Sequence, residues 1–225
     1  MTTDTHPAAF QEFPKLARLS RECIITEKID GTNAQVFIYD PIENTQAQEG
    51  FTSAADASGK VWNIKAGSRT RWVTPASDNH GFAKWVWDNA EKLVHLGPGR
   101  HFGEWWGQGI QRNYGMREKR WSLFNVARWC LHGKEPQRIL TADPRIVKMQ
   151  EVLPECCHLV PVLHRGIFTT DLCELGLEGL RIFGSFAAPG FMKPEGIVCF
   201  HVAGNFGFKK TLDNDALPKG AIPQK

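Results

Sequence analysis

The chain has 225 residues, of which 42% are hydrophobic and 23% are charged, and its formal net charge is +3. These proportions are typical of a soluble globular protein and exclude a disordered or fibrous chain. No apolar run approaches the roughly 20 residues that span a bilayer, and the polar N-terminus lacks the apolar centre of a signal peptide, so we expect a cytoplasmic protein without a membrane partner.

The first half of the chain alternates strand-like segments with loops. A lead-in of about 20 residues, with helical character at Phe13–Leu19, precedes a pair of strands on either side of residues 27–33. Residues 41–60 are rich in small polar side chains and predict a long loop. Residues 61–73 return to strand-like sequence. Residues 78–96 carry apolar side chains at helical spacing, which predicts an amphipathic helix whose tryptophans face the core.

The second half contains further strands and short helices. The expected strands are residues 100–106, 120–131, 158–168, 196–201 and 206–212, and the expected helices are residues 144–152 and 171–183. The second of these helices begins with Asp171 and Glu174, which are spaced for a capping pair. Strands mixed with a few helices, without a regular β-α-β rhythm, predict an α+β fold of mainly antiparallel sheets with flanking helices. We expect one domain over residues 1–225.

The segment EKIDGTN, residues 27–33, is the most informative part of the chain. It presents Lys28 in a K-x-D-G turn between two strand-like segments. A lysine that attacks a phosphate must first lose its proton, which requires burial or neighbouring positive charge. Gly31 allows the backbone to turn tightly and to pass close to a ligand. Alone, the motif is weak, because Asp-Gly is common in turns.

Five further segments follow the Lys28 turn in a characteristic order. They are FGEWWG at 102–107, GIQRNY at 109–114, WSLFNV at 121–126, PEGIV at 194–198 and FKKT at 208–211. In this order, the set resembles the covalent nucleotidyltransferases, which comprise RNA ligases, ATP-dependent DNA ligases and mRNA capping guanylyltransferases. The similarity is greatest to RNA ligases of the RNA ligase 2 type and spans residues 27–211.

The resemblance implies the fold and the reaction. The fold would be the ATP-grasp-like ligase domain, in which antiparallel sheets hold the nucleotide between them, and the short tail after Thr211 leads us to expect no OB-fold. Lys28 would attack the α-phosphorus of ATP and carry AMP on its nitrogen. The AMP would pass to the 5′-phosphate of an RNA, and a 3′-hydroxyl would then displace it. Mg²⁺ or Mn²⁺ would assist, held by Glu195, because Mg²⁺ prefers oxygen ligands.

The resemblance also assigns the residues around the phosphates. Lys209 matches the basic residue of the last motif, which contacts the α-phosphate, and Lys210 is the second candidate. Neighbouring side chains on a strand point to opposite faces, so only one of the two lysines should reach the site, and we choose Lys209. Arg69 matches an arginine available to phosphate or ribose.

Other residues of the motifs would bind the nucleoside. Glu104 matches the ribose-binding carboxylate, and Phe124 matches the aromatic residue that stacks on adenine, with Trp121 as the fallback. Glu27 would read the adenine amino group, as in RNA ligase 2 relatives. Asp30, Thr32 and Asn33 are expected to support the turn and the later steps. Relatives often have Phe-Asp-Ile where this chain has Phe-Asn-Val at 124–126, so the role of that carboxylate has no counterpart here.

A cluster of basic and aromatic residues suits an RNA partner, because phosphates and stacked bases favour that combination. Its members are Arg112, Arg117, Lys119 and Arg120, interleaved with Trp105, Trp106, Tyr114 and Trp121. An accessory protein could help to hold the substrate. Two alternatives stay open: a compact DNA ligase or GTP-using capping enzyme, and a non-catalytic module that binds a nucleotide or RNA.

Overall fold

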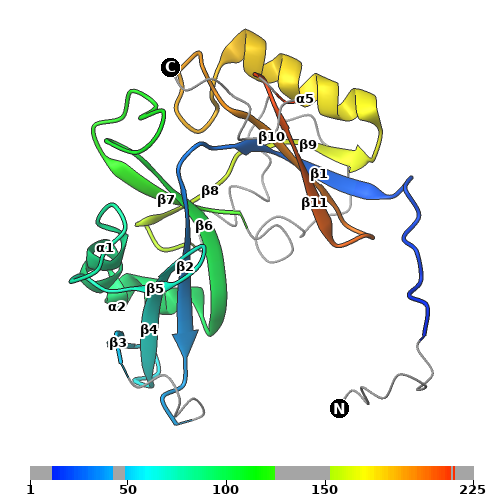
Figure 1. Ribbon diagram of the computed structural model, residues 1–225. Coiled ribbons are helices and arrows are strands. Elements are labelled where there is room, and N and C mark those ends of the chain that lie inside the picture. The colour runs from blue at the N-terminus through cyan, green and yellow to red at the C-terminus, as the bar shows by residue number, and fades with distance from the viewer. Residues whose placement is uncertain (1–11, 43–48, 125–152, 214, 216–225) are drawn as a thin grey trace.

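The computed structural model describes residues 12–42, 49–124, 153–213 and 215. Two β-sheets, with helices on their outer faces, form an α+β fold of mainly antiparallel pairing, as the sequence predicted (Figure 1). The strands are β1 (Glu22–Lys28), β2 (Thr32–Tyr39), β3 (Thr52–Ala55), β4 (Val61–Ser68), β5 (Trp72–Val73), β6 (Gly99–Gly107), β7 (Lys119–Leu123), β8 (Cys157–Leu159), β9 (Val162–Ile167), β10 (Gly196–His201) and β11 (Phe206–Thr211). The helices are α1 (Phe82–Asp88), α2 (Ala90–Leu93), the 3-10 turn η1 (Val94–Leu96) and α5 (Thr170–Phe183).

The smaller sheet has four strands in the order β11-β10-β1-β9, all antiparallel. Helix α5 lies across one face of this sheet (Figure 1). Alternate residues of β1 and β10 point towards the helix, because successive side chains of a strand face opposite sides. Cys23, Ile25 and Ile197 therefore pack with Leu177 and Leu180 in one buried cluster.

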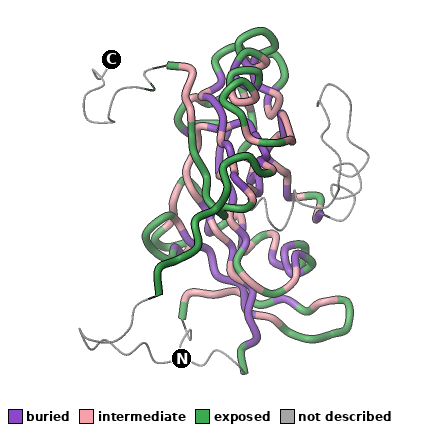
Figure 2. Tube along the Cα trace, turned by 90° about the vertical axis from the view of Figure 1, so that its right-hand side faces the viewer, coloured by how far each residue is buried: buried purple, intermediate pink, exposed green. Residues whose placement is uncertain are grey.

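The larger sheet has the strand order β3-β4-β2-β6-β7-β8, and β5 pairs with β4. Only the β7–β8 pair is parallel among the described strands. Val36, Ile38 and Ile64 on one face of this sheet pack with Phe82 and Leu93 of the α1–η1 segment. Burial is concentrated along the strands, whereas the helices turn exposed residues outwards (Figure 2). The opposite face of the sheet carries no described helix.

The helical segment predicted at 78–96 is interrupted. Helix α1 ends at Asn89, whose φ of −113° leaves the helical region, and whose side-chain amide donates to the carbonyl of Trp85 at 2.8 Å. The apolar spacing continues through the break into α2. Trp85 and Trp87 pack against the core, as the periodicity predicted.

Four local predictions were wrong. Residues 13–19 form no helix. Residues 158–168 form two strands, which are separated at Pro161 because proline has no amide to donate to the ladder. Part of the loop predicted at 41–60 forms the strand β3. The N-cap of α5 is Thr169, whose hydroxyl accepts from the Leu172 amide, rather than a pair of acidic residues.

Two predictions lie outside the described residues: the helix at 144–152 and the end of the strand at 120–131. In the parts of the chain that the structure describes, no helix has both the length and the apolar character needed to cross a bilayer.

Candidate functional site

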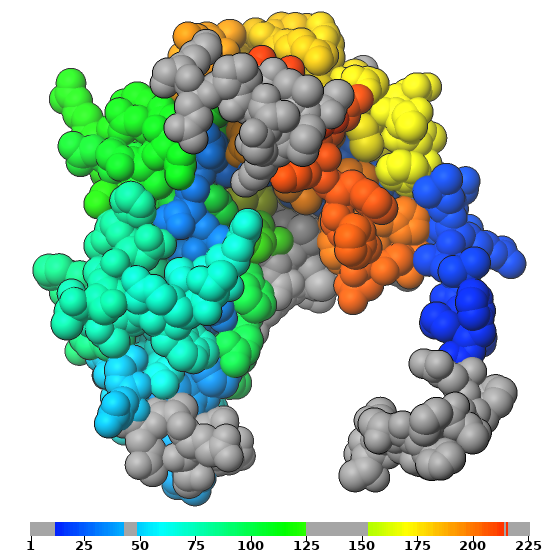
Figure 3. All heavy atoms as spheres, viewed as in Figure 1, coloured from blue at the N-terminus to red at the C-terminus, as the bar shows by residue number. Residues whose placement is uncertain are grey.

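The two sheets meet where β1 ends and β2 begins. Lys28 is the last residue of β1 in the four-stranded sheet, and Thr32 opens β2 in the other sheet. The molecule is hollowed between the larger sheet and the β10–β11 hairpin (Figure 3). A cavity of about 430 Å³ opens beside Lys28. Its lining residues are Thr26, Glu27, Lys28, Ile29, Asn33, Arg69, Glu104, Phe124, Val160, Val198, Phe200 and Asn205.

The amine of Lys28 forms an ion pair with Glu195. The Nζ atom lies 2.5 Å from Oε2, and the two side chains are 24% and 17% exposed. Glu195 directly precedes Gly196, which pairs with Lys28 across the β1–β10 ladder. The strand register therefore brings the two groups together. The amine must leave this carboxylate and lose a proton before it can act as a nucleophile.

Gly31 is required by close packing rather than by its backbone angles. A β-carbon at this position would lie 2.5 Å from the carbonyl oxygen of Trp105 and 2.7 Å from the β-carbon of Trp106. The amide of Gly31 donates to Oε1 of Glu104 at 3.1 Å. The K-x-D-G turn thus passes directly over β6, and its amide helps to fix the Glu104 carboxylate.

Glu104 has the most perturbed carboxylate of the pocket. Burial raises its pKa to about 7, and the nearby positive charge of Lys28 and the Gly31 amide partly oppose this shift. Asn33 pairs with Glu104 across the β2–β6 ladder, so both side chains face the pocket. The carboxylate is placed to accept hydrogen bonds from hydroxyl groups in the pocket.

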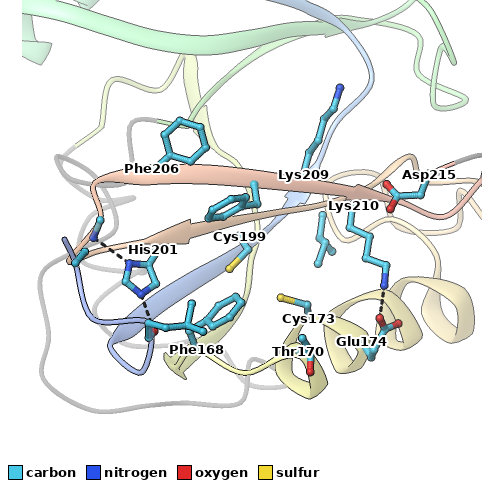
Figure 4. A pocket seen from close by; sticks show the side chains of 15 residues that line it. Phe168, Thr170, Cys173, Glu174, Cys199, His201, Phe206, Lys209, Lys210 and Asp215 are labelled. Atoms are coloured by element: carbon cyan, nitrogen blue, oxygen red, sulfur yellow. Dashed lines mark hydrogen bonds and ion pairs between the residues drawn. The ribbon is translucent and has the colours of Figure 1, made fainter. Parts of the chain in front are cut away.

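Lys209 and Lys210 point to opposite sides of β11. Lys209 pairs with Val198, which lines the Lys28 pocket, whereas Lys210 pairs with Ile197, which packs under α5. Figure 4 shows Lys210 reaching Glu174 of α5 and Lys209 extending away from that helix. The structure therefore places Lys209, and not Lys210, on the strand face that carries Val198, although Lys209 is not itself among the residues that line the Lys28 cavity.

The same alternation separates the two aromatic candidates of β7 and its continuation. Trp121 is fully buried in the core beside Phe82 and Trp85. Glu104 pairs with Ser122, so the pocket face of this strand continues at Phe124, which lines the cavity. Trp121, the fallback for base stacking, is a core residue.

Glu27 lines the cavity, but its side chain lies on the opposite face of β1, towards α5. It pairs with Ile197, on the α5 side of the sheet, and is 1% exposed. Its carboxylate accepts from the Ser185 hydroxyl at 2.6 Å and from the amides of Phe186 and Ala187 at 2.8 and 2.9 Å. Burial raises its pKa, against these hydrogen bonds. Both oxygens of the Glu27 carboxylate thus accept hydrogen bonds from the protein itself. The structure therefore gives no support to the expected contact between Glu27 and the adenine amino group.

The basic and aromatic cluster expected around residues 105–121 does not expose its rings, although Arg117 and Lys119 are exposed. Its aromatic members are buried: Trp105, Trp106, Tyr114 and Trp121. Arg112 pairs with Asp30, Arg120 pairs with Glu118, and Lys119 donates to the carbonyl of His80. The density of tryptophan in this strand-like sequence had indicated that the rings stack on bases. The aromatic side chains pack instead into the interior of the protein.

Two features of the pocket were missed by the sequence analysis. Phe200 lines the cavity beside Val198, and the alternation within β10 could have identified it, since both lie on the face of Thr26. The loop at 185–187 that holds Glu27 could not have been identified, because the partners are 158 to 160 residues apart.

Metal ligands are sparse around Lys28. Among the described residues, no group of three or more His, Cys, Asp or Glu side chains is close enough to hold a metal ion. The carboxylates available to a cation beside Lys28 are those of Glu195 and Glu104.

The fold is similar to solved RNA ligase structures. An arginine-to-alanine variant of the Naegleria gruberi RNA ligase with ATP and Mn superposes with a TM-score of 0.50 and 16% identity, covering 87% of this chain and 51% of that chain. A glutamate-to-alanine variant of the same ligase, also with ATP and Mn, gives a TM-score of 0.51 and 17% identity with the same coverage. This chain thus spans about half the length of these structures. No curated protein matches it significantly.

The family comparison covers most of the chain. The family described as RNA ligase matches residues 21–211, which include both sheets, the Lys28 turn and the β10–β11 hairpin. The chain belongs to the RNA ligase family.

Proposed function

We propose that this protein is an ATP-dependent RNA ligase that works through a lysyl-AMP intermediate. The observation that carries the proposal is the half-buried Lys28 amine, which lies against Glu195 at the junction of the two sheets. Glu104 faces the same pocket, and Lys209 extends from the pocket side of β11. Both sheets contribute to the pocket, which supports a single nucleotidyltransferase domain over residues 1–225.

In the first step, the Nζ atom of Lys28 attacks the α-phosphorus of ATP. A nitrogen–phosphorus bond forms, the bond to the bridging oxygen breaks, and pyrophosphate leaves. Lys209 and Arg69 neutralise negative charge that develops on the phosphates. Because the reaction is a displacement in line with the leaving group, positioning and charge neutralisation supply most of the catalysis.

The carboxylates of the pocket fit a divalent cation. Mg²⁺ keeps several waters and needs only one or two protein carboxylates, and the partly exposed Glu195 meets that requirement. Glu195 would hold Mg²⁺ or Mn²⁺, with Glu104 nearby, and the cation supplies charge neutralisation at the triphosphate. A Glu195 carboxylate engaged in this way would release the Lys28 amine from its ion pair.

The pocket also suits the nucleoside. Phe124 and Phe200 provide flat apolar walls for a base, and Glu104 and Asn33 provide hydrogen-bonding groups for ribose. Asp30 acts through the turn rather than on the nucleotide, because its carboxylate is paired with Arg112. Lys210 and the Glu27 carboxylate lie outside this pocket and have no nucleotide role in the proposal.

The later steps use the same phosphorus chemistry. The 5′-phosphate of an RNA attacks lysyl-AMP and receives the AMP, which frees Lys28. The 3′-hydroxyl of the second end then attacks the activated 5′-phosphate and expels AMP, which seals the strand. Membership of the RNA ligase family supports RNA as the substrate, and the solved relatives with ATP and Mn support the nucleotide and the cation. We place this repair activity in the cytoplasm.

A labelling experiment tests the proposal. Purified protein is incubated with Mg²⁺ and ATP labelled at the α-phosphate, and the wild type should become labelled through an acid-labile bond. Lys28→Ala should show no label, and Lys84→Ala, a change at an exposed lysine of α1, should label like the wild type. Label that survives in Lys28→Ala, or its absence from the wild type, would contradict the proposal.

Two further comparisons separate the alternatives. We expect ATP to label the protein and GTP to fail, which distinguishes a ligase from a capping enzyme. We expect the adenylylated protein to seal 5′-phosphorylated nicked RNA faster than nicked DNA. Preferential sealing of DNA would indicate a compact DNA ligase.

A further inference from the structure

The pocket face of the seven-stranded sheet continues well beyond the Lys28 pocket. Asn33 and Glu104 form a pair on this face, followed by Gln35 with Phe102 and then by Phe37 with Arg100. Since side chains alternate along a strand, all of these share the face that lies opposite α1 and α2. Asn33 and Phe37 are four residues apart, so the row extends about 13 Å from the pocket.

Aromatic rings and cations are stacked at the far end of this row. The ring of Phe37 lies 4.9 Å from that of Tyr39 and 6.1 Å from that of Trp72, with interplanar angles of 18° and 25°. The guanidinium of Arg100 lies 4.4 Å from the centre of Phe37 and 5.2 Å from that of Trp72. The ammonium of Lys65 lies 5.6 Å from the Trp72 ring. We call these five residues the aromatic–basic stripe.

The two cations of this stripe are Arg100 and Lys65. Within the described residues, neither Arg100 nor Lys65 forms an ion pair with a carboxylate. Arg100 donates instead to the amide oxygen of Gln35 at 3.1 Å, which fixes the guanidinium over the rings. Arg100 is exposed and Trp72 is 39% exposed, whereas Lys65 is largely buried beside them. The stripe therefore offers a guanidinium and a ring to a ligand, above a second positive charge.

Arg69 connects the stripe with the pocket. It is exposed, lines the Lys28 cavity and follows Ser68, the last residue of β4. Trp72 pairs with Gly67 at the start of β5 and lies over it, with a ring carbon 3.1 Å from where a β-carbon of Gly67 would be. A side chain at position 67 would thus displace the ring. The β4–β5 hairpin therefore carries both Arg69, which lines the Lys28 pocket, and Trp72, which belongs to the stripe.

We propose that the aromatic–basic stripe binds the polynucleotide strand next to the end that is being joined. Arg100 would bind a phosphate, Lys65 would add to the positive potential, and Trp72 would stack against an unpaired base. Single-stranded nucleic acid requires this combination of cations and rings. The stripe begins within four strand residues of Asn33, so the bound strand leads into the Lys28 pocket. This inference rests on the proposed ligase function and adds the surface that holds its substrate.

The test measures RNA binding and adenylylation on the same preparations. A fluorescent, 5′-phosphorylated single-stranded RNA is titrated with the full chain, and anisotropy gives the dissociation constant over a range of salt concentrations. Trp72→Ala should weaken binding about tenfold. Arg100→Ala should reduce the slope of log K against log salt by about 0.7, the value for one phosphate contact on a single strand. Both variants should keep the wild-type rate of labelling by ATP.

Matched changes on the outer helix provide the controls. Arg181→Ala and Phe183→Ala alter an exposed arginine and an exposed aromatic residue of α5, and neither should change RNA binding. If Trp72→Ala does not fold, Trp72→Phe keeps a ring and should bind like the wild type, and Arg100→Ala then decides.

The outcomes separate this inference from the proposed function. Trp72→Ala and Arg100→Ala variants that are labelled normally, and that bind RNA with the wild-type dissociation constant and salt slope, would contradict RNA binding by the stripe. The proposed ligase function would be unaffected. Wild-type protein that binds RNA but is never labelled by ATP would refute the ligase function instead. Equal weakening by the α5 controls would also overturn the stripe.

Discussion

Arg112 joins the turn after Lys28 to the segment before Glu195. Its Nε atom lies 3.0 Å from Oδ2 of Asp30, and its NH1 group donates to the carbonyl of Lys193 at 3.0 Å. The hydroxyl of Tyr114 accepts from the Asp30 amide at 2.8 Å, so the β6–β7 loop binds this residue twice. Arg112, from the β6–β7 loop of the larger sheet, therefore contacts both the segment that follows Lys28 and the segment that precedes Glu195.

Arg112→Ala should slow lysyl-AMP formation about 10- to 100-fold, because a small displacement of a reacting group is costly. The maximal rate should fall more than the apparent affinity for ATP, since Arg112 acts on the position of Lys28. Arg112→Lys can restore one of the two contacts and should recover part of the rate. Single-turnover labelling over a range of ATP concentrations measures both parameters. A pure loss of ATP affinity would contradict this role.

Lys209 and Lys210 should differ sharply. Lys209→Ala removes a cation from the pocket side of β11 and should slow adenylylation by about 100-fold or more, the usual loss for a group that stabilises the transition state. Lys210→Ala breaks an exposed pair with Glu174 and should change the rate and the stability little. Labelling rates of the two variants, measured side by side, test this. Equal losses of adenylylation rate in the two variants would show that the strand face of a lysine does not determine its role in the reaction.

Glu104 should make the stability depend on pH. Its pKa is about 7 in the folded protein, compared with about 4.5 without burial, so the folded state binds the proton more tightly. Below the lower value the carboxyl group is neutral in both states. As the pH rises towards 7, the unfolded chain ionises first, and the free energy of unfolding should fall by at most about 3 kcal/mol.

Urea denaturation of the wild type and of Glu104→Gln, from about pH 5 to about pH 8, isolates this contribution. The glutamine does not titrate, so the wild type should lose stability relative to the variant as the pH rises. A constant difference between the two would contradict the effect of burial on Glu104.

Two glycines with opposite surroundings provide a further test. Gly31→Ala would force a β-carbon against the backbone of Trp105, and overpacking of this kind costs about 1–3 kcal/mol. Gly179 lies in α5, and a β-carbon added there would meet no atom within 4 Å, so Gly179→Ala should stabilise the helix by up to about 1 kcal/mol. Thermal unfolding measures both. A neutral Gly31→Ala would mean that the turn can move away from β6.

Several features of the site could be predicted from residue order alone. Strand alternation separates Lys209 from Lys210 because neighbouring side chains point apart. The same rule places Glu27 opposite Lys28, and its burial follows from that geometry, although the motif had suggested a contact with adenine. The resemblance favoured Phe124 over Trp121, but the structural reason for that choice, the pairing of Glu104 with Ser122, is contained in no local pattern.

The aromatic residues show the limit of composition as a guide. Tryptophans near arginines suggested a surface at residues 105–121, where the rings are buried in the core. An exposed pair of an aromatic ring and a cation lies instead at Trp72 of β5 and Arg100 of β6. Segments that do not neighbour each other in sequence cannot be combined into one surface until the sheet order is known.

The amino-acid sequence predicted the lysine at a strand end and the antiparallel α+β class, because periodicity and turn chemistry are local. The order of the motifs supplied the resemblance to a family. The contact of Glu195 with Lys28, across 167 residues, and that of Arg112 with Asp30, across 82, became evident from the folded chain. Such contacts depend on strand register and on the packing of one sheet against the other. They form only when the whole chain has folded.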